Sequence, residues 1–500
     1  MPQRLFPVTT ALAALLIGVA QAQPAGPVGV RNGLPPAVAE ALTRAQLPLE
    51  ALSVVVRDVE APRPQLSWQA DRPVNPASLF KLVTTLVALD QLTPAFTWST
   101  GVWLDGSVRD GVLDGSLVIR GSGDPTLVPE RVWMLLRRVQ QLGVREIRGD
   151  IVLDRSAFAT EPGSPGDFDG EPLRPYNARP DALLLAHKAV VYTFTPDRAR
   201  GVAAVAVEPS LLGHQVDPVV ALAPGPCNDW RAQLKPSPGD PTRMAFAGTY
   251  PTSCGERSWP LAYPEPATYN ARLLRSLWQG LGGTLLGSVV DGPAPSTTPT
   301  FEWRSPPLTE AVRDINKHSN NVRAQQLFLT LAARPGGTAT SAGAREVMRR
   351  WLAERLPTHE AVIVNGSGLN RDQRVSAAML ADLLRWAWAS PVMPELAASL
   401  PISGLDGTLR RARAGNGLAH LKTGTLRDVA AIGGYVVTPS GQWRIVVAVI
   451  QHPLANSARS ALEAVVEWAS EVATPVDTTP RLNPAAAAAA APARRASGRR

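Results

Sequence analysis

Two β-rich runs on either side of a turn predict a β-hairpin near the N-terminus, with a helix before it and a helix after it. The runs 53–59 and 65–70 are β-rich and flank a turn-forming segment at 61–64. Helical periodicity at 36–47 predicts a helix before the hairpin. After the hairpin, the segment 75–92 begins with Asn-Pro-Ala-Ser and continues as an apolar helix. A proline near a helix start removes no needed donor, so it marks this boundary well.

From about residue 97 to residue 295 the pattern changes to short β-rich runs separated by Gly, Pro and Asp. Examples are 115–120, 148–153, 202–207 and 284–290. Proline and glycine are densest between 222 and 266. This pattern of short β-rich runs and turn residues predicts one or two β-rich insert domains.

Helical patterns return after the β-rich region. They cover 308–333, 340–356 and 376–390. Two strands follow at 429–437 and 444–450, joined by a turn, and an amphipathic helix at 458–473 closes the pattern. This order predicts an α+β fold in which an antiparallel sheet flanked by helices is interrupted by the β-rich insert.

The sequence predicts an export signal at the N-terminal end of the chain and a disordered tail at the C-terminal end. Arg4, an apolar run from Val8 to Ala20 and the sequence Ala20-Gln21-Ala22 predict a signal peptide over 1–22. The run is shorter than the roughly 20 residues that a membrane-spanning helix needs, although a retained anchor is the alternative. Residues 474–500 are rich in Pro and Ala and end in arginines, so we expect a disordered tail. The mature protein is expected to be exported, without a stable membrane span.

Composition excludes several classes of protein. The chain is 45% hydrophobic and 18% charged with a mean hydropathy of −0.02, unlike a disordered or polytopic membrane protein. The formal net charge of +8 lies mostly at the two ends, which argues against a nucleic-acid partner. Two cysteines and scattered histidines offer no metal-ligand pattern, so no metal or cofactor is expected. In an oxidising compartment Cys227 and Cys254 would form one disulfide, and two free thiols are the alternative.

Lysine usage directs attention to a few positions. Of 50 basic residues only five are lysine, namely Lys81, Lys188, Lys235, Lys317 and Lys422. A guanidinium stays protonated, whereas a buried or crowded ammonium can lose its proton, so lysine is expected where arginine cannot replace it.

Ser78 and Lys81 have the spacing of a nucleophile and its base. The two residues are three positions apart at the start of a helix, so their side chains share one face of the helix and can touch. A serine whose proton passes to a lysine amine is a known form of covalent catalysis. Ser-x-x-Lys arises by chance about 0.3 times in this composition, and a serine at a helix start is commonly a cap. Position alone therefore leaves both interpretations open.

Two further motifs complete an ordered set. Lys422-Thr423-Gly424 is expected by chance only about 0.03 times, and Thr425 follows it close to the strand at 429–437. Ser319-Asn320-Asn321 falls on the helical segment after residue 308. Together they give the S-x-x-K, S-x-N, K-T-G set of penicillin-interacting serine enzymes.

The chain resembles one subfamily of these enzymes. Further stretches carry the resemblance: 121–127, 315–321, 365–369 and 404–409. They are similar to D-alanyl-D-alanine carboxypeptidase/endopeptidases of the penicillin-binding protein 4 type, the S13 peptidases. The 241 residues between Ser78 and Ser319 also suit that subfamily, which carries extra domains in this interval. The resemblance covers about residues 30–473.

The resemblance implies a division of the chain. The discontinuous peptidase domain would comprise 23–96 and 296–473, with a penicillin-binding/β-lactamase-like transpeptidase fold. A β-rich insert domain would comprise 97–185 and 263–295, with a small nested domain at 186–262.

The resemblance also implies roles for the motif residues. Ser78 would be the acylated nucleophile, Lys81 its general base and Ser319 the relay of a proton to the leaving D-alanine amine. Asn321 would hydrogen-bond the substrate amide. The carboxylate would be held by Lys422 with the strand Thr423-Gly424-Thr425, and Lys422 would also keep Lys81 neutral. The N–H groups of Ser78 and Thr425 would form the oxyanion hole.

The implied activity is the trimming of peptidoglycan stem peptides or cross-bridges in the periplasm through an acyl-serine intermediate, with β-lactam antibiotics as covalent inhibitors. A β-lactamase-like hydrolase is one alternative, although no Glu-x-x-Leu-Asn is found to supply a deacylating glutamate. A non-catalytic peptidoglycan-binding or penicillin-sensing module is the other. Three other residues are given no catalytic role. Lys317 is interpreted as a solvated charge or an ion-pair partner, and Lys188 as a structural residue. Asp406 is interpreted as a turn residue or as a partner of Lys422.

Overall fold

The computed structural model describes residues 33–471 with the exception of 160, 241, 334 and 335. The predicted signal peptide at 1–22 and the predicted tail at 474–500 lie outside the described residues.

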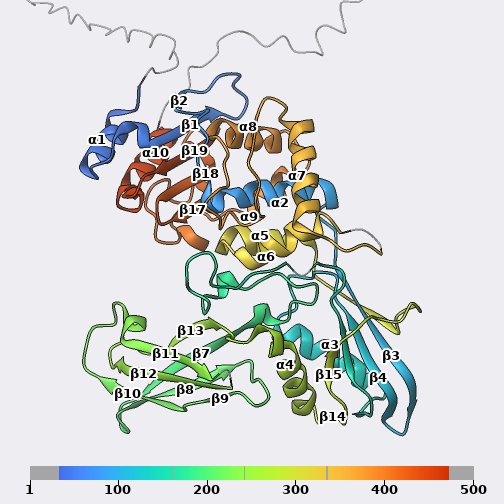
Figure 1. The fold of residues 1–500 in the computed structure, drawn as a ribbon. Coiled ribbons are helices and arrows are strands. Elements are labelled where there is room, and N and C mark those ends of the chain that lie inside the picture. The colour runs from blue at the N-terminus through green and yellow to red at the C-terminus, as the bar shows by residue number, and fades with distance from the viewer. Residues whose placement is uncertain (1–32, 160, 241, 334–335, 472–500) are drawn as a thin grey trace, which may run out of the picture. The chain divides into compact units, whose positions relative to one another are not determined.

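A five-stranded antiparallel sheet joins the two ends of the described chain (Figure 1). Its strands, in spatial order, are β17 (Ala419–Leu426), β18 (Val429–Val437), β19 (Trp443–Gln451), β1 (Leu52–Asp58) and β2 (Leu66–Trp68). The predicted hairpin is β1 and β2, and Leu52 at the start of β1 pairs with Ile450 near the end of β19. Residues from opposite ends of the sequence therefore form the middle of the sheet.

Both faces of this sheet are buried. On β19, Ile445, Val447 and Val449 belong to one hydrophobic cluster, while the alternate residues Val446 and Ala448 belong to another. Successive side chains of a strand point to opposite faces, so an uninterrupted apolar run supplies two cores. Helices must therefore cover both faces of the sheet.

The helices divide between the two clusters. One face is covered by α1 (Pro36–Arg44) and α10 (Arg459–Glu471). The helices that contribute to the other cluster are α2 (Phe80–Leu92), α5 (Leu308–His318), α6 (Asn321–Thr330), α7 (Ser341–Arg355), α8 (Ala377–Trp388) and α9 (Met393–Ser399).

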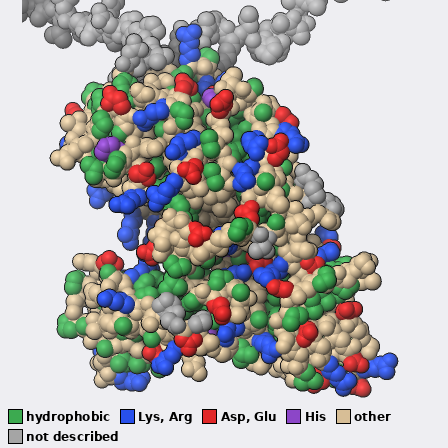
Figure 2. Space-filling model, in the orientation of Figure 1, with side chains coloured by type: hydrophobic (Ala, Val, Ile, Leu, Met, Phe, Trp, Pro, Cys, Tyr) green, Lys and Arg blue, Asp and Glu red, His purple; other side chains and the backbone are tan. Residues whose placement is uncertain are grey.

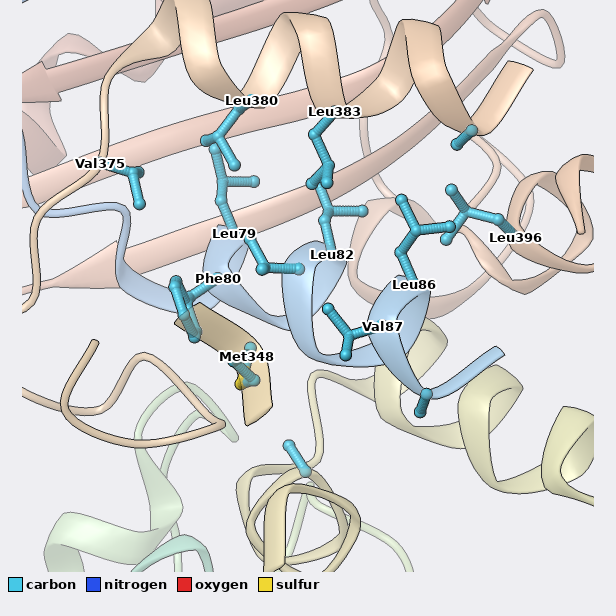
Figure 3. Close-up of a cluster of buried hydrophobic side chains, with 14 of the residues drawn as sticks. Leu79, Phe80, Leu82, Leu86, Val87, Met348, Val375, Leu380, Leu383 and Leu396 are labelled. Atoms are coloured by element: carbon cyan, nitrogen blue, oxygen red, sulfur yellow. The ribbon is translucent and has the colours of Figure 1, made fainter. Parts of the chain in front are cut away.

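Helix α2 runs through the middle of the second cluster. Its residues from Phe80 to Leu89 are all buried, and this stretch is mainly apolar, with Lys81, Thr84 and Thr85 as its polar members. Figure 3 shows Leu82 beside Leu383 of α8 and Leu86 beside Leu396 of α9. This packing holds the start of α2, and with it Ser78, in a fixed place.

The interval between α2 and α5 contains two further seven-stranded sheets. The first holds β3 (Ser99–Arg109), β4 (Val112–Arg120), β5 (Glu146–Ile147), β6 (Ile151–Asp154), β14 (Thr284–Leu285), β15 (Val289–Asp291) and β16 (Phe301–Arg304). The second holds β7 (Ala189–Asp197), β8 (Val202–Glu208), β9 (Gln215–Val216), β10 (Val219–Ala223), β11 (Leu234–Asp240), β12 (Arg243–Pro251) and β13 (Arg257–Ala262). Helices α3 (Pro129–Gln141) and α4 (Pro266–Gly280) share a core with both sheets.

Two details refine the expectations for this region. Strand β16 pairs with β3, so the first insert sheet continues beyond residue 295, where the sequence placed its end. Cys227 and Cys254 form a disulfide, which decides between the two interpretations left open by the sequence. The division of the chain into domains stays a prediction.

Candidate active site

Ser78 lies in a short 3₁₀ turn, η2 (Ala77–Leu79), that leads directly into α2. Ala77 before it has a φ of +46°, a region that costs energy for a residue with a Cβ. Asn75 supports the turn, because its Oδ1 accepts a hydrogen bond from the Ala77 N–H at 2.8 Å. Its amide nitrogen also donates to the carbonyl of Asn370 at 2.8 Å. The serine is thus presented on a braced, strained turn.

The Lys81 amine is fully buried and surrounded by three acceptors. Its Nζ lies 2.9 Å from Ser78 Oγ, 2.6 Å from Asn321 Oδ1 and 2.6 Å from the carbonyl oxygen of Ser367. Asn321 is the first residue of α6, whereas Ser367 lies in a loop before α8. Three segments that are far apart in sequence therefore meet at one nitrogen.

This arrangement suits a neutral amine as well as an ammonium. A neutral amine has two N–H donors, which Asn321 Oδ1 and the Ser367 carbonyl can accept, and one lone pair that can accept the Ser78 hydroxyl proton. Burial lowers the pKa of Lys81 well below its usual range, and the charge of Lys422 lowers it further. The geometry thus accommodates, and the electrostatics favours, an amine that can take a proton from Ser78.

Lys422 and Ser319 form a second pair on the other side of the site. The Lys422 Nζ donates to Ser319 Oγ at 2.9 Å and to the Thr423 carbonyl at 2.8 Å. Burial lowers the pKa of Lys422 to about 7. A hydroxyl in contact with such an amine is well placed to pass a proton.

Gly424 allows the edge strand β17 to approach the serine turn. A Cβ at this position would lie 2.8 Å from the Pro76 carbonyl oxygen and 3.3 Å from the Ala77 Cβ. Gly368 does the same from the loop before α8, where a Cβ would lie 1.9 Å from the Ala77 carbonyl oxygen. Glycine is therefore needed at both places for close backbone contact.

The motif residues open onto a pocket of about 1560 Å³. Those that line it are Ser78, Ser319, Asn321, Thr423 and Thr425. The two amines lie behind this lining, since Lys81 and Lys422 are each 0% exposed. All eight candidate residues thus belong to one site, whose assigned roles stay predictions.

The structure corrects two details of the sequence interpretation. Ser319 was expected within a helix, but it forms the left-handed C-cap between α5 and α6, with φ 56° and ψ 38°. Lys422 was expected just before or at the start of β18, but it lies inside a separate strand, β17. The break at Ser319 frees its side chain from the helix surface and directs it to Lys422.

Sequence reasoning missed the role of one residue, Ser367. It contributes a backbone carbonyl to Lys81, so its side chain carries no signal of this contact. The available signal was the pair of glycines around it, because Gly366 is also closely packed, with a Cβ position 2.4 Å from the Phe328 Cβ.

The remaining lysines near the motifs are structural or supporting. Lys317 is buried and its amine lies 2.5 Å from Asp406 Oδ2, so it is an ion-pair partner and not a solvated charge. Asp406 also accepts a hydrogen bond from the Ile402 N–H, which makes it a turn residue that pairs with Lys317 instead of Lys422. Lys188 is buried against Asp181 at 2.7 Å.

Comparison with known proteins identifies the family. Residues 34–472 match the family described as D-Ala-D-Ala carboxypeptidase 3 (S13). The chain belongs to the D-Ala-D-Ala carboxypeptidase 3 (S13) family. The resemblance to the S13 peptidases and the predicted enzyme class, a D-Ala-D-Ala carboxypeptidase, are thereby confirmed.

Individual members of the S13 family are similar over most of the chain. A D-alanyl-D-alanine carboxypeptidase of Actinomadura sp. (strain R39) is 29% identical over 415 residues, which are 78% of this chain and 76% of that protein. The D-alanyl-D-alanine carboxypeptidase DacB of Haemophilus influenzae is 24% identical over 379 residues, 73% of this chain and 78% of that protein.

A solved structure confirms the fold class. Penicillin binding protein 4 (dacB) from Haemophilus influenzae superposes with a TM-score of 0.70 at 21% identity, covering 86% of this chain and 97% of that one. The α+β penicillin-binding fold with extra domains is therefore correct. Within residues 33–471, as far as they are described, no helix has the length and apolarity to cross a membrane.

Proposed function

We propose that this D-Ala-D-Ala carboxypeptidase works through an acyl-enzyme on Ser78, with Lys81 as the general base. The observation that carries the proposal is the contact of the buried Lys81 amine with Ser78 Oγ at 2.9 Å, beside two acceptors that hold its N–H groups. A neutral amine so oriented has its lone pair directed at the serine.

The reaction then follows from the positions of the groups. Ser78 Oγ attacks the carbonyl carbon of the penultimate D-alanine while its proton passes to Lys81 Nζ. Backbone N–H groups of Ser78 and Thr425 stabilise the oxyanion. The C–N bond breaks as Ser319, supplied by Lys422, delivers a proton to the leaving amine. Water later attacks the ester and its proton passes to Ser78 Oγ, which releases the shortened peptide and restores the hydroxyl. Lys81 gives its extra proton to solvent and Lys422 takes one up, so both amines return to their starting states.

The chemical class of the substrate follows from the family. The proposed substrates are peptidoglycan stem peptides and cross-bridges that end in D-alanine. β-Lactams are proposed as covalent inhibitors, because the same serine would open their amide. This agrees with a structure of Haemophilus influenzae penicillin binding protein 4 complexed with a β-lactam, which has a TM-score of 0.66 to this chain.

The proposed location is the periplasm. Support comes from the sequence at 1–22, whose charged start, short apolar run and Ala20-Gln21-Ala22 are typical of a cleaved signal peptide. N-terminal sequencing of the exported protein tests this directly, and a mature chain that begins at Gln23 is expected. A chain that retains Met1 would contradict it.

Labelling with a fluorescent penicillin tests the catalytic proposal. We expect lasting label on the purified protein, with the added mass on the peptide that contains Ser78, and none on a Ser78→Ala variant. Absence of label would favour a binding module, whereas rapid loss of label with turnover would favour a β-lactamase. Mass analysis of products from purified peptidoglycan fragments then separates removal of a terminal D-alanine from cleavage of cross-bridges.

A further inference from the structure

Lys422 is poorly placed to supply a fixed charge to a ligand in the pocket. Its side chain is 0% exposed, and its amine is engaged by Ser319 Oγ and by the Thr423 carbonyl. Because burial lowers the pKa of Lys422 to about 7, this amine is only partly charged near neutral pH. A side chain that stays charged over the whole working pH range would hold a carboxylate more firmly.

Arg459 meets this requirement at the same end of β17. It is the first residue of α10 and lines the pocket together with Thr423 and Thr425. Its Nη2 donates to Thr425 Oγ1 at 3.1 Å and to Asn456 Oδ1 at 2.9 Å. The guanidinium is therefore attached to the strand whose hydroxyls face the pocket.

Asn456 fixes this guanidinium relative to β17. Its Nδ2 donates to the carbonyl oxygens of Leu426 at 2.7 Å and Arg427 at 3.1 Å, at the end of the strand. The Asn456 side-chain amide thus links the end of β17 to the Arg459 guanidinium. An exposed arginine that is held on two sides loses less entropy when it binds a ligand than a free one does.

The charge of Arg459 has no structural explanation. Within the described part of the chain its two hydrogen-bond partners are neutral, and no carboxylate oxygen lies within 4.0 Å of it. A cation in the first turn of a helix also opposes the helix dipole, so helix stability does not explain the residue. An unpaired guanidinium at a pocket surface is suited to bind an anion, above all a carboxylate with two parallel hydrogen bonds.

The pocket lining carries charges of both signs. Arg371, Arg411 and Arg427 accompany Arg459, while Glu130, Asp169, Glu208 and Glu463 carry the opposite charge. In Figure 2, Lys and Arg side chains gather on the surface near β17. The Thr425 hydroxyl, whose oxygen accepts from Arg459, keeps its own proton free to donate to a carboxylate.

We infer that Arg459 holds the terminal carboxylate of the substrate, with the Thr425 hydroxyl as a second donor. The inference rests on the proposed function for the reaction and adds the residue that selects the ligand. It makes Arg459 a specificity-determining residue, because a free C-terminal carboxylate separates a true substrate from the same peptide ending in an amide.

Equilibrium binding in a Ser78→Ala background tests this without requiring turnover. The probes are diacetyl-L-Lys-D-Ala-D-Ala and its C-terminal amide, measured by calorimetry. We expect the carboxylate peptide to bind about 10- to 100-fold more tightly than the amide, the usual range for a hydrogen bond to a charged group. Adding Arg459→Gln should reduce this preference to within about 3-fold, and Arg459→Lys should keep part of it. Arg410→Gln, which removes an exposed charge outside the pocket lining, should keep all of it.

Turnover provides the second readout. In otherwise unaltered enzyme, Arg459→Gln should raise KM for the carboxylate peptide about 10- to 100-fold with little change in kcat, while activity on the amide stays the same. Equal weakening of both peptides, or an unchanged preference, would overturn the inference. Should the unaltered protein bind with the expected preference yet cleave neither peptide, the proposed function fails and the assignment of Arg459 stands.

Discussion

Gly424 stands so close to Pro76 that a side chain between them would force the backbone apart. The nearest atom to a Cβ built on Gly424 is the Pro76 carbonyl oxygen, at 2.8 Å. That oxygen belongs to the turn that presents Ser78, so it cannot move without moving the nucleophile. By contrast, Gly433 on the neighbouring strand has its nearest atom at 3.5 Å, an ordinary contact distance.

We therefore expect Gly424→Ala to slow acylation by about 100-fold, because a displacement of about 1 Å at a reacting group costs that much. Gly433→Ala, at the position that pairs with Lys422 on β18, is the matched control and should stay within about 3-fold of the unaltered enzyme. The measurement is the rate of labelling by a fluorescent penicillin, together with the melting temperature. Equal rates for the two variants would show that the close approach of β17 is unimportant.

Lys81→Arg should abolish acylation while the fold survives. A guanidinium stays protonated and cannot accept the Ser78 proton, so a loss of about 10³-fold or more is expected. Lys188→Arg is the control for the same exchange at another buried lysine, which pairs with Asp181 and does not itself line the pocket. Penicillin labelling and circular dichroism of both variants provide the comparison. Normal labelling of the Lys81 variant would eliminate this residue as the base.

The pH dependence of acylation should respond to Lys422. Lys81 must be neutral to act, so the rate rises with pH through the pKa of Lys81, which the charge of Lys422 lowers. Because the pKa of Lys422 is about 7, this repulsion operates mainly below pH 7. Lys422→Met removes it, and the acidic limb of the profile should shift to higher pH.

The test for Lys422 is the second-order acylation rate from pH 4 to pH 10, which reports the pair of amines as a coupled system. Lys422→Arg, which keeps a positive charge, serves as the comparison and should leave the limb near its original position. A limb that moves to lower pH in Lys422→Met would contradict the electrostatic coupling.

The Lys317–Asp406 ion pair should position Ser319 and Thr423 together. Lys317 precedes Ser319 by two residues, and Gly407 after Asp406 packs against the Lys317 carbonyl, with a Cβ position only 2.5 Å from that oxygen. Thr408 then contacts the Thr423 hydroxyl at 2.8 Å. The loop therefore links the second motif to the third.

Asp406→Asn should lower the free energy of unfolding by about 2 kcal/mol, less than for a fully buried pair because the Asp406 side chain is 38% exposed. We also expect acylation to slow by about 10-fold. Combining it with Lys317→Met should recover much of the stability, since no buried charge is left unpaired, but not the rate. Additive losses of stability in the double variant would argue against coupling.

The contact between the proposed nucleophile and its base could be predicted from the sequence because the two residues are close together in the chain. Ser78 and Lys81 are three residues apart, so helix geometry alone brings them together. The strands 429–437 and 444–450 were visible because uninterrupted apolar runs mark strands buried on both faces. The family resemblance supplied the long-range assembly of the three motifs, which no local pattern could give.

The features that were missed are tertiary in origin. The apolar residues Ile315 and Val322 are seven positions apart, so the polar residues between them resemble the exposed face of one continuous helix. The local signal of a break was Asn320, which caps the start of α6. Strand β17 carries Lys, Thr and Gly, residue types that suit contact with the serine turn and the pocket better than they suit a strand. Its sequence therefore did not predict a strand. Ser367 acts through its backbone, and a carbonyl oxygen is the same for every residue type.

The pairing of β1 with β19 delays the completion of this enzyme until the chain is almost finished. Strand β1 precedes Ser78, yet its long partner is made nearly four hundred residues later. Before then it has only the three-residue β2 beside it, and an isolated two-stranded hairpin is marginal in water. A truncated or half-synthesised chain would thus hold its nucleophile beside an incomplete sheet.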